Sequence, residues 1–142
     1  MFLESVKTGF RKGVDTVWFL SKIIVPVYIV VTIIRYTPVM HVIGNFFRPL
    51  MKLFNLPGEA AIPFITGFFL DEYGVIAAIK AISLNSYQIT TIAIMALFFH
   101  TIFIESAVMK KLGLSITFFS VFRFSLAIIF GIIIGQFGGV LW

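Results

Sequence analysis

The sequence predicts an all-α integral membrane protein with about three transmembrane helices, a re-entrant helical hairpin and amphipathic helices at the membrane interface. Hydrophobic residues make up 60% of the 142 residues and charged residues only 12%. That polar fraction is too small to cover the surface of a soluble domain of this size. Several apolar runs are long enough to cross a bilayer. Two more are half as long and flank an acidic turn, as in a hairpin that enters a membrane and returns.

The composition also narrows the function classes. The absence of cysteine excludes disulfides and thiolate metal sites. The two histidines, His41 and His100, are too far apart in sequence to form a metal-ligand motif. We therefore expect no metal and no cofactor. The net charge of +5 comes from basic residues scattered along the chain, so we expect contact with the lipid bilayer and none with nucleic acid.

Residues 1–15 are predicted to form an amphipathic interfacial helix, ahead of a membrane domain at 16–142. Apolar residues recur every four positions, and charged residues occupy another side, as in a helix lying in the membrane plane. The apolar positions are Phe2, Val6, Phe10 and Val14. A frayed tail is the alternative. The apolar run that follows is too long for the core of a signal peptide, so no cleavable signal is expected.

Residues 16–36 are the first predicted span. Trp18 near its start and Arg35-Tyr36 at its end are residues typical of membrane interfaces. Residues 38–54 then place apolar and polar side chains on opposite faces with helical spacing. We interpret this second segment as a helix lying on the membrane that leads the chain into the hairpin.

The hairpin is predicted at about residues 57–84. Its two apolar arms, Ala60–Leu70 and Gly74–Leu84, are separated by Asp71, Glu72 and Tyr73. Each arm is about half of the ~20 residues that a spanning helix needs. The alternative is one helix through both arms that crosses once. That helix would hold two adjacent carboxylates near mid-span, where ionised groups are costly.

Four polar residues at the two ends of the hairpin are candidate site residues. Glu59 begins the first arm, where a carboxylate either stabilises the helix dipole or faces a polar cavity with the free amides of the helix start. In a cavity it would hold a cation, a proton or the hydroxyls and amines of a solute. Asn85, Ser86 and Gln88 follow the second arm, where they either cap the next helix or meet Glu59 at the same depth, as in transporter sites.

Residues 88–106 are the second predicted span and carry two further candidates, His100 and Glu105. Ionisable residues inside a membrane are functional-site hypotheses by default. The alternative for Glu105 is an interfacial ion pair with Lys110 or Lys111, which follow closely.

Residues 114–141 are the third predicted span. Arg123 lies well inside it, and we expect it to pair with Glu105 or Glu59. Four glycines of this span are expected to form a close-packing face: Gly131, Gly135, Gly138 and Gly139. The chain holds one copy of the hairpin unit, whereas transporter folds commonly pair two inverted copies around a midplane site. We therefore expect a homodimer, possibly antiparallel, or a paralogous membrane partner.

The stretches LPGEAAIPFITGFF and NSYQITTIAIMALFFHTIFIE resemble the nucleoside-recognition or Gate domain, and the Pro-Gly-Glu-Ala-Ala segment is the most specific part. This family includes the small spore maturation proteins A and B of bacteria. Similar units are repeated in concentrative nucleoside transporters and in the membrane part of ferrous iron transporters. The resemblance implies a solute site lined by the hairpin and the helix break after it. Carried onto this chain, it points to Glu59, Asn85, Ser86 and Gln88.

These observations predict a transport-type module of the bacterial inner membrane that crosses it several times. It would bind a small polar solute, nucleoside-like or a cation, at a midplane site completed by dimerisation. The alternative is a scaffold or assembly protein that does not transport and uses the hairpin to pack against a partner chain. An enzyme is not expected, because His100 and Glu105 lack a partnered nucleophile.

Overall fold

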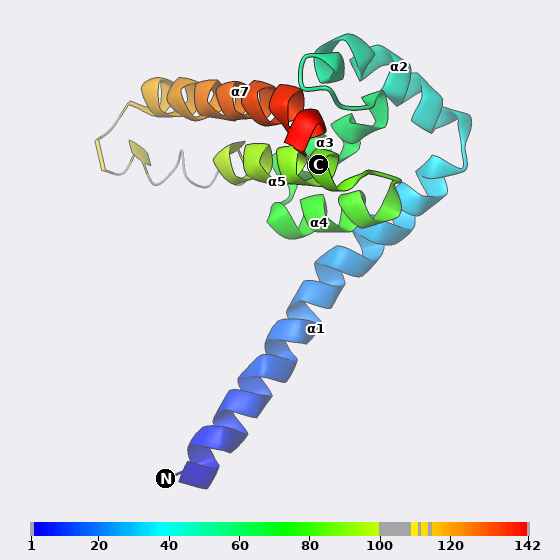
Figure 1. The fold of residues 1–142 in the computed structure, drawn as a ribbon. Helices are drawn as coiled ribbons and strands as arrows, with labels where there is room; N and C mark the ends of the chain where they lie inside the picture. The colour runs from blue at the N-terminus through cyan, green and yellow to red at the C-terminus, as the bar shows by residue number, and fades with distance from the viewer. Residues whose placement is uncertain (1, 100–108, 111, 114, 142) are drawn as a thin grey trace.

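The computed structural model describes residues 2–99, 109–110, 112–113 and 115–141, and within them it contains helices and turns but no strand. The all-α prediction is confirmed for these residues (Figure 1). The elements are α1 (Phe2–Arg35), α2 (Pro38–Lys52), the 3-10 helix η1 (Gly58–Ala60), α3 (Ala61–Phe69), α4 (Glu72–Ala81), α5 (Ser86–Phe99) and α7 (Ile116–Leu141).

Helix α1 is one continuous helix of 34 residues. The helix therefore does not end near residue 15, where the predicted interfacial helix and the first predicted span meet. No proline lies near that boundary, and Gly9 and Gly13 each cost a helix only about 1 kcal/mol. Figure 1 shows the N-terminal half of α1 projecting away from the other helices, while its C-terminal half packs against α4. The position of residues 1–15 at a membrane interface stays a prediction.

Two described segments have the length and composition of membrane spans, Glu4–Arg35 and Ile116–Gly138. They correspond to the first and third predicted spans. Of the second predicted span, the structure describes only α5, up to Phe99, because the rest lies outside the described residues.

The hairpin stretch forms two helices, α3 and α4, which pack against each other. The alternative of one helix through both arms is therefore wrong. Asp71 explains the break, since its side chain accepts a 3.0 Å hydrogen bond from the Gly74 amide and caps the start of α4. Gly67 of α3 lies so close to Val75 of α4 that a side chain at Gly67 would collide with it.

Gly131 and Gly135 of α7 form part of the predicted close-packing face, Gly138 makes only ordinary contacts, and the surroundings of Gly139 lie outside what the structure describes. A Cβ at Gly131 would collide with Met95 of α5, and one at Gly135 would overlap the backbone carbonyl of Phe54. Helices α5 and α7 thus pack side by side, as small residues allow in membrane proteins. The rings of Phe98 and Phe130 stack between the same two helices, with centroids 5.4 Å apart.

The hairpin runs alongside α7. At its base, the Asn55 side-chain amide donates a 3.2 Å hydrogen bond to the Gly135 carbonyl near the end of α7. At its tip, the ring of Phe68 lies 6.4 Å from that of Phe124. Phe124 is about 12 Å from the start of α7, at a rise of about 1.5 Å per residue. The hairpin therefore begins and ends near the C-terminal end of α7 and turns beside its first half.

Arg123 does not pair with Glu59, which corrects one of the two expected pairings; Glu105, the other expected partner, lies outside the described residues. The Arg123 guanidinium donates a 3.3 Å hydrogen bond to the Leu97 carbonyl of α5 and lies over the Phe119 ring. The two side chains lie at opposite ends of the hairpin and so do not meet. Arg123 lies beside the hairpin tip, whereas Glu59 lies at the hairpin base.

Candidate functional site

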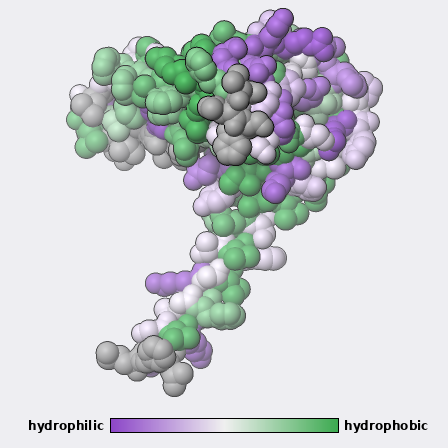
Figure 2. All heavy atoms as spheres, in the orientation of Figure 1, coloured by the Kyte–Doolittle hydropathy of each residue, from purple (hydrophilic) through white to green (hydrophobic). Residues whose placement is uncertain are grey.

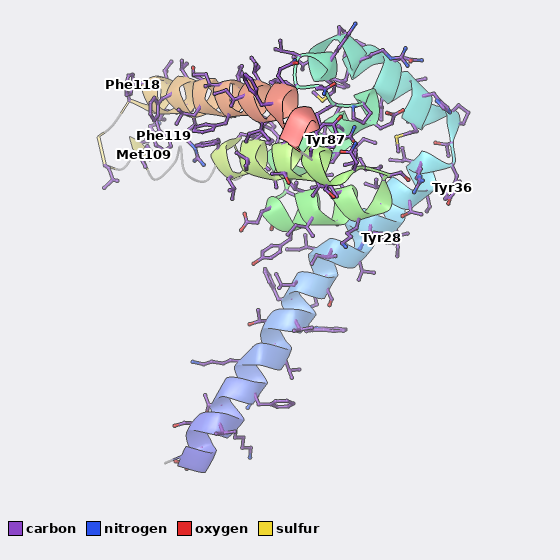
Figure 3. The ribbon with its side chains drawn as sticks, viewed as in Figure 1. Tyr28, Tyr36, Tyr87, Met109, Phe118 and Phe119 are labelled. Atoms are coloured by element: carbon purple, nitrogen blue, oxygen red, sulfur yellow. The ribbon has the colours of Figure 1, made fainter. Side chains whose placement is uncertain are left out.

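A pocket of about 220 Å³ lies where the hairpin begins and ends. It is formed by the end of α1, the first turn of α2 and both ends of the hairpin. Its lining residues are Arg35, Met40, Pro57, Glu59, Ile82, Ser83 and Leu84. Figure 3 labels Tyr36, the neighbour of Arg35, at the turn between α1 and α2 and so marks this end of the molecule. The pocket thus joins segments that are far apart in the sequence.

Arg35 supplies the positive charge of the pocket. Its Nη2 donates a 2.7 Å hydrogen bond to the Ser83 hydroxyl, and its Nη1 donates a 3.2 Å bond to the Ala81 carbonyl. Ala81 is the last residue of α4, and carbonyls in the last turn of a helix lack intrahelical partners. Arg35 therefore satisfies a helix terminus and holds the exit of the hairpin against the end of α1.

Glu59 supplies the negative charge and is half-buried. Two glycines bring it against α2, because a Cβ at Gly58 would overlap the Gly44 carbonyl and only glycine fits this contact. Among the described residues, the Glu59 carboxylate accepts no hydrogen bond and has no ion pair within 4 Å. It is an acceptor available to a bound molecule.

Asn85 and Gln88 bond to each other's backbone and do not line the pocket. The backbone N–H of Gln88 donates a 3.0 Å hydrogen bond to Asn85 Oδ1, and the backbone N–H of Asn85 donates a 3.0 Å bond to Gln88 Oε1. This reciprocal pair is a capping box at the start of α5. Ser86 has an exposed side chain. These three residues share the hairpin base with Glu59, but the pocket reaches only as far as Leu84.

The other two predicted site residues, His100 and Glu105, lie outside the described residues. The pocket roles of Arg35 and Ser83 were not predicted from the sequence. Arg35 was expected to be an interface anchor, and no local pattern connects two residues that are 48 positions apart.

The pocket is suited to binding polar groups. It holds one guanidinium and one carboxylate, and its other walls are mainly apolar. Its described side chains provide hydrogen-bond donors and acceptors, not a nucleophile paired with a base. Within the described part of the chain, no group of three or more His, Cys, Asp or Glu side chains is placed to hold a metal.

Comparison with known proteins assigns this chain to a family. The model of the Gate family, described as nucleoside recognition, matches residues 17–115. The chain is 39% identical over 126 residues to the uncharacterized membrane protein YvoD of Bacillus subtilis (strain 168). That match covers 89% of this chain and 40% of YvoD, so the chain spans about two-fifths of this curated relative. No solved structure matches significantly. The chain belongs to the Gate family of nucleoside-recognition domains.

Proposed function

We propose that this chain is a transport-type membrane module that binds a small polar solute through Glu59. The observation that carries the proposal is the half-buried Glu59 carboxylate, which lies in a pocket between the two ends of the hairpin and has no partner among the residues that the structure describes. Buried polar groups normally have hydrogen-bond partners. A carboxylate without one is therefore a candidate ligand-binding group, and the family's description as nucleoside recognition supports this choice.

The hairpin is proposed to re-enter the membrane from the side on which α7 ends. This is supported by the hydrogen bond from Asn55 to Gly135 at its base and by the contact of Phe68 with Phe124 at its tip. Helix α3, with nine residues, is about 14 Å long, less than half of the ~30 Å hydrocarbon core. The solute would then be bound near the mouth of a hairpin whose tip lies within the bilayer.

A neutral, nucleoside-like solute fits this pocket better than a cation. A bare cation would be attracted by Glu59 but repelled by Arg35, which faces the same pocket. A solute with hydroxyl or amino donors can bond to the carboxylate without this repulsion. The described pocket also offers a single carboxylate, whereas hard cations take about six oxygen ligands.

A second unit is proposed to complete the site. The pocket of about 220 Å³ is smaller than the roughly 300–1,000 Å³ of typical ligand pockets, so one chain would enclose only part of a solute. YvoD extends well beyond the matched region, which leaves room in that relative for a further unit. The proposed second unit is a second copy of this chain, possibly antiparallel, or a paralogous chain.

A scaffold or assembly role is the second candidate. It is favoured by the structural use of polar groups at the hairpin base, where Arg35, Asn85 and Gln88 all bond to groups of the chain itself. Under this reading the Gly44–Gly58 contact would fix a packing surface, and Glu59 would make no solute contact.

Glu59→Gln separates the two candidates. In proteoliposomes, the transport proposal expects nucleoside binding or uptake to fall at least about tenfold, the loss that follows from removing a charged hydrogen bond of ~1.5–3 kcal/mol. The thermal midpoint of the purified protein should stay unchanged. Asp15→Asn on the exposed part of α1 is the matched control and should bind like the wild type. The scaffold role would be supported instead if Glu59→Gln lowered the thermal midpoint and neither the wild type nor either variant bound nucleoside.

A further inference from the structure

We infer that α2 binds anionic phospholipid headgroups through one row of exposed polar side chains, and that this contact holds Glu59 in its position. The inference rests on the solute site of the proposed function and adds its regulation by the membrane. The spacing of the row, four, three and four residues, places its members on one side of an α-helix. The row consists of His41, Asn45, Arg48 and Lys52, all with exposed side chains.

The row carries positive charge that the described part of the chain does not neutralise. Helix α2 contains no Asp or Glu. Among the described residues, the side chains of Arg48 and Lys52 make no hydrogen bond and have no ion pair within 4 Å. The helix dipole favours a cation at Lys52, in the last turn, but Arg48 lies a turn further in. Basic residues beside a membrane attract anionic lipid headgroups, which are therefore the complementary partner.

Both ends of α2 lie where a candidate span ends. The chain enters α2 shortly after the candidate span Glu4–Arg35. Just beyond α2, the Asn55 side chain bonds to the Gly135 carbonyl, near the end of the candidate span Ile116–Gly138. When these two spans cross a bilayer, α2 therefore runs along its surface. Figure 2 agrees with this orientation, since hydrophilic side chains gather around α2, and hydrophobic ones cover much of the end formed by α5 and α7.

The other two sides of α2 fit the same orientation. One side packs against the protein and contains the buried Met40, Gly44 and Met51. Another side is apolar but open, with Val42 67% exposed and Phe46 75% exposed. A helix at a bilayer surface places such an apolar side in the acyl chains and its charged side among the headgroups. Lipid thus accounts both for the open apolar side and for the row.

Gly44 connects the row to the solute site. It lies three residues after His41 and four before Arg48, so it adjoins the row on the helix surface. A Cβ at Gly44 would lie only 3.2 Å from Glu59 Oε1, and a Cβ at Gly58 would overlap the Gly44 carbonyl. Glu59 therefore rests against the backbone of α2. A headgroup bound to the row fixes this backbone and, with it, the carboxylate that would bind the solute.

Removal of the two cations tests the headgroup contact. The row variant combines Arg48→Gln with Lys52→Gln. The matched control combines Lys7→Gln with Arg11→Gln, which removes the same charge from exposed positions of α1. Native mass spectrometry of the purified, delipidated protein counts bound phosphatidylglycerol and phosphatidylcholine, and circular dichroism reports folding. The inference expects the wild type and the control to prefer phosphatidylglycerol, and the row variant to bind it at least about tenfold less, since each basic residue contributes roughly fivefold.

Thiol labelling tests the effect on the solute site without any solute. Glu59→Cys is reconstituted into nanodiscs of phosphatidylcholine, with and without phosphatidylglycerol, and labelled with an uncharged maleimide. Ser86→Cys controls for effects of the lipid charge on thiols, because position 86 is exposed at the hairpin base and does not line the pocket. Phosphatidylglycerol should slow labelling at position 59 at least about fivefold, a typical coupling between sites, and change it less than about twofold at position 86. The row variant should abolish the effect.

Equal binding of the two lipids, or equal losses in the row variant and its control, would overturn the headgroup contact. Labelling of position 59 that does not change with phosphatidylglycerol would overturn the regulation. Uridine binding that is lost in Glu59→Gln but equal in both membranes would also overturn the regulation, while the solute site would stand. If uridine bound in neither membrane and phosphatidylglycerol still slowed labelling at position 59, the solute site alone would be refuted. The two proposals therefore fail separately.

Discussion

The Arg35 guanidinium and the Ser83 hydroxyl are joined by a 2.7 Å hydrogen bond across 48 positions of sequence. This bond, with the second one to the Ala81 carbonyl, fixes the exit of the hairpin to the end of α1. Glu59, at the entrance of the hairpin, faces the same pocket. Both ends of the hairpin therefore meet at this pocket, and a substitution at Arg35 should alter the pocket.

Arg35→Lys should lower the stability of the protein although the charge is kept. A lysine ammonium lacks the planar fork that reaches two acceptors at once. Loss of one hydrogen bond costs about 1 kcal/mol, and the exposure of Arg35 keeps the loss near this value. Thermal unfolding in detergent measures it, with Arg48→Lys on the exposed face of α2 as control. An equal midpoint for both variants would contradict the role assigned to Arg35.

Asn85→Ala should destabilise the start of α5 by about 1 kcal/mol, the usual cost of removing an N-cap. Gln88→Ala should cost less than the cap itself, because it removes the reciprocal half of the capping box. Neither change should weaken solute binding by Glu59, since these side chains do not line the pocket. Binding and thermal unfolding of the two variants test this division. If either variant lost solute binding without losing stability, the substituted residue would belong to the solute site.

Gly58→Ala should destabilise the protein by about 1–3 kcal/mol or more, the range for overpacked sites. The new methyl group would overlap the Gly44 carbonyl, which is backbone and has no rotamer to escape into. Gly9→Ala on α1 is the matched control, because nothing lies within 4 Å of the added carbon. It should stabilise α1 by up to about 1 kcal/mol. Comparable midpoints for the two variants would rule out the close contact between η1 and α2.

The parts of the fold that were predictable are those governed by local chemistry. Two half-length arms around Asp71 indicated a helix break, and the structure has that break with Asp71 as its cap. The glycine spacing of α7 indicated a packing face, which Gly131 and Gly135 form. Asn85 was a good capping residue, and it caps α5.

What could not be predicted depends on tertiary contacts. The amphipathic start of the chain suggested a separate helix, but helical propensity continues through it and α1 is unbroken. The partnership of Arg35 with Ser83 arises only when the end of α1 reaches the end of α4. The location of Glu59 depends on the Gly44–Gly58 contact, which no sequence period reveals.

The most direct test of the account is the sidedness of the two hairpin ends. The chain has no cysteine, so a single introduced cysteine is the only thiol that can be labelled. Leu53→Cys lies before the hairpin and Ser83→Cys at its end, both at exposed positions. Labelling of each with a membrane-impermeant thiol reagent is compared between intact and permeabilised cells. Phe10→Cys on α1 reports the opposite side. The account predicts one labelling pattern for positions 53 and 83 and the reverse pattern for position 10. Labelling of positions 53 and 83 from opposite sides would contradict the re-entrant hairpin and, with it, the proposed site.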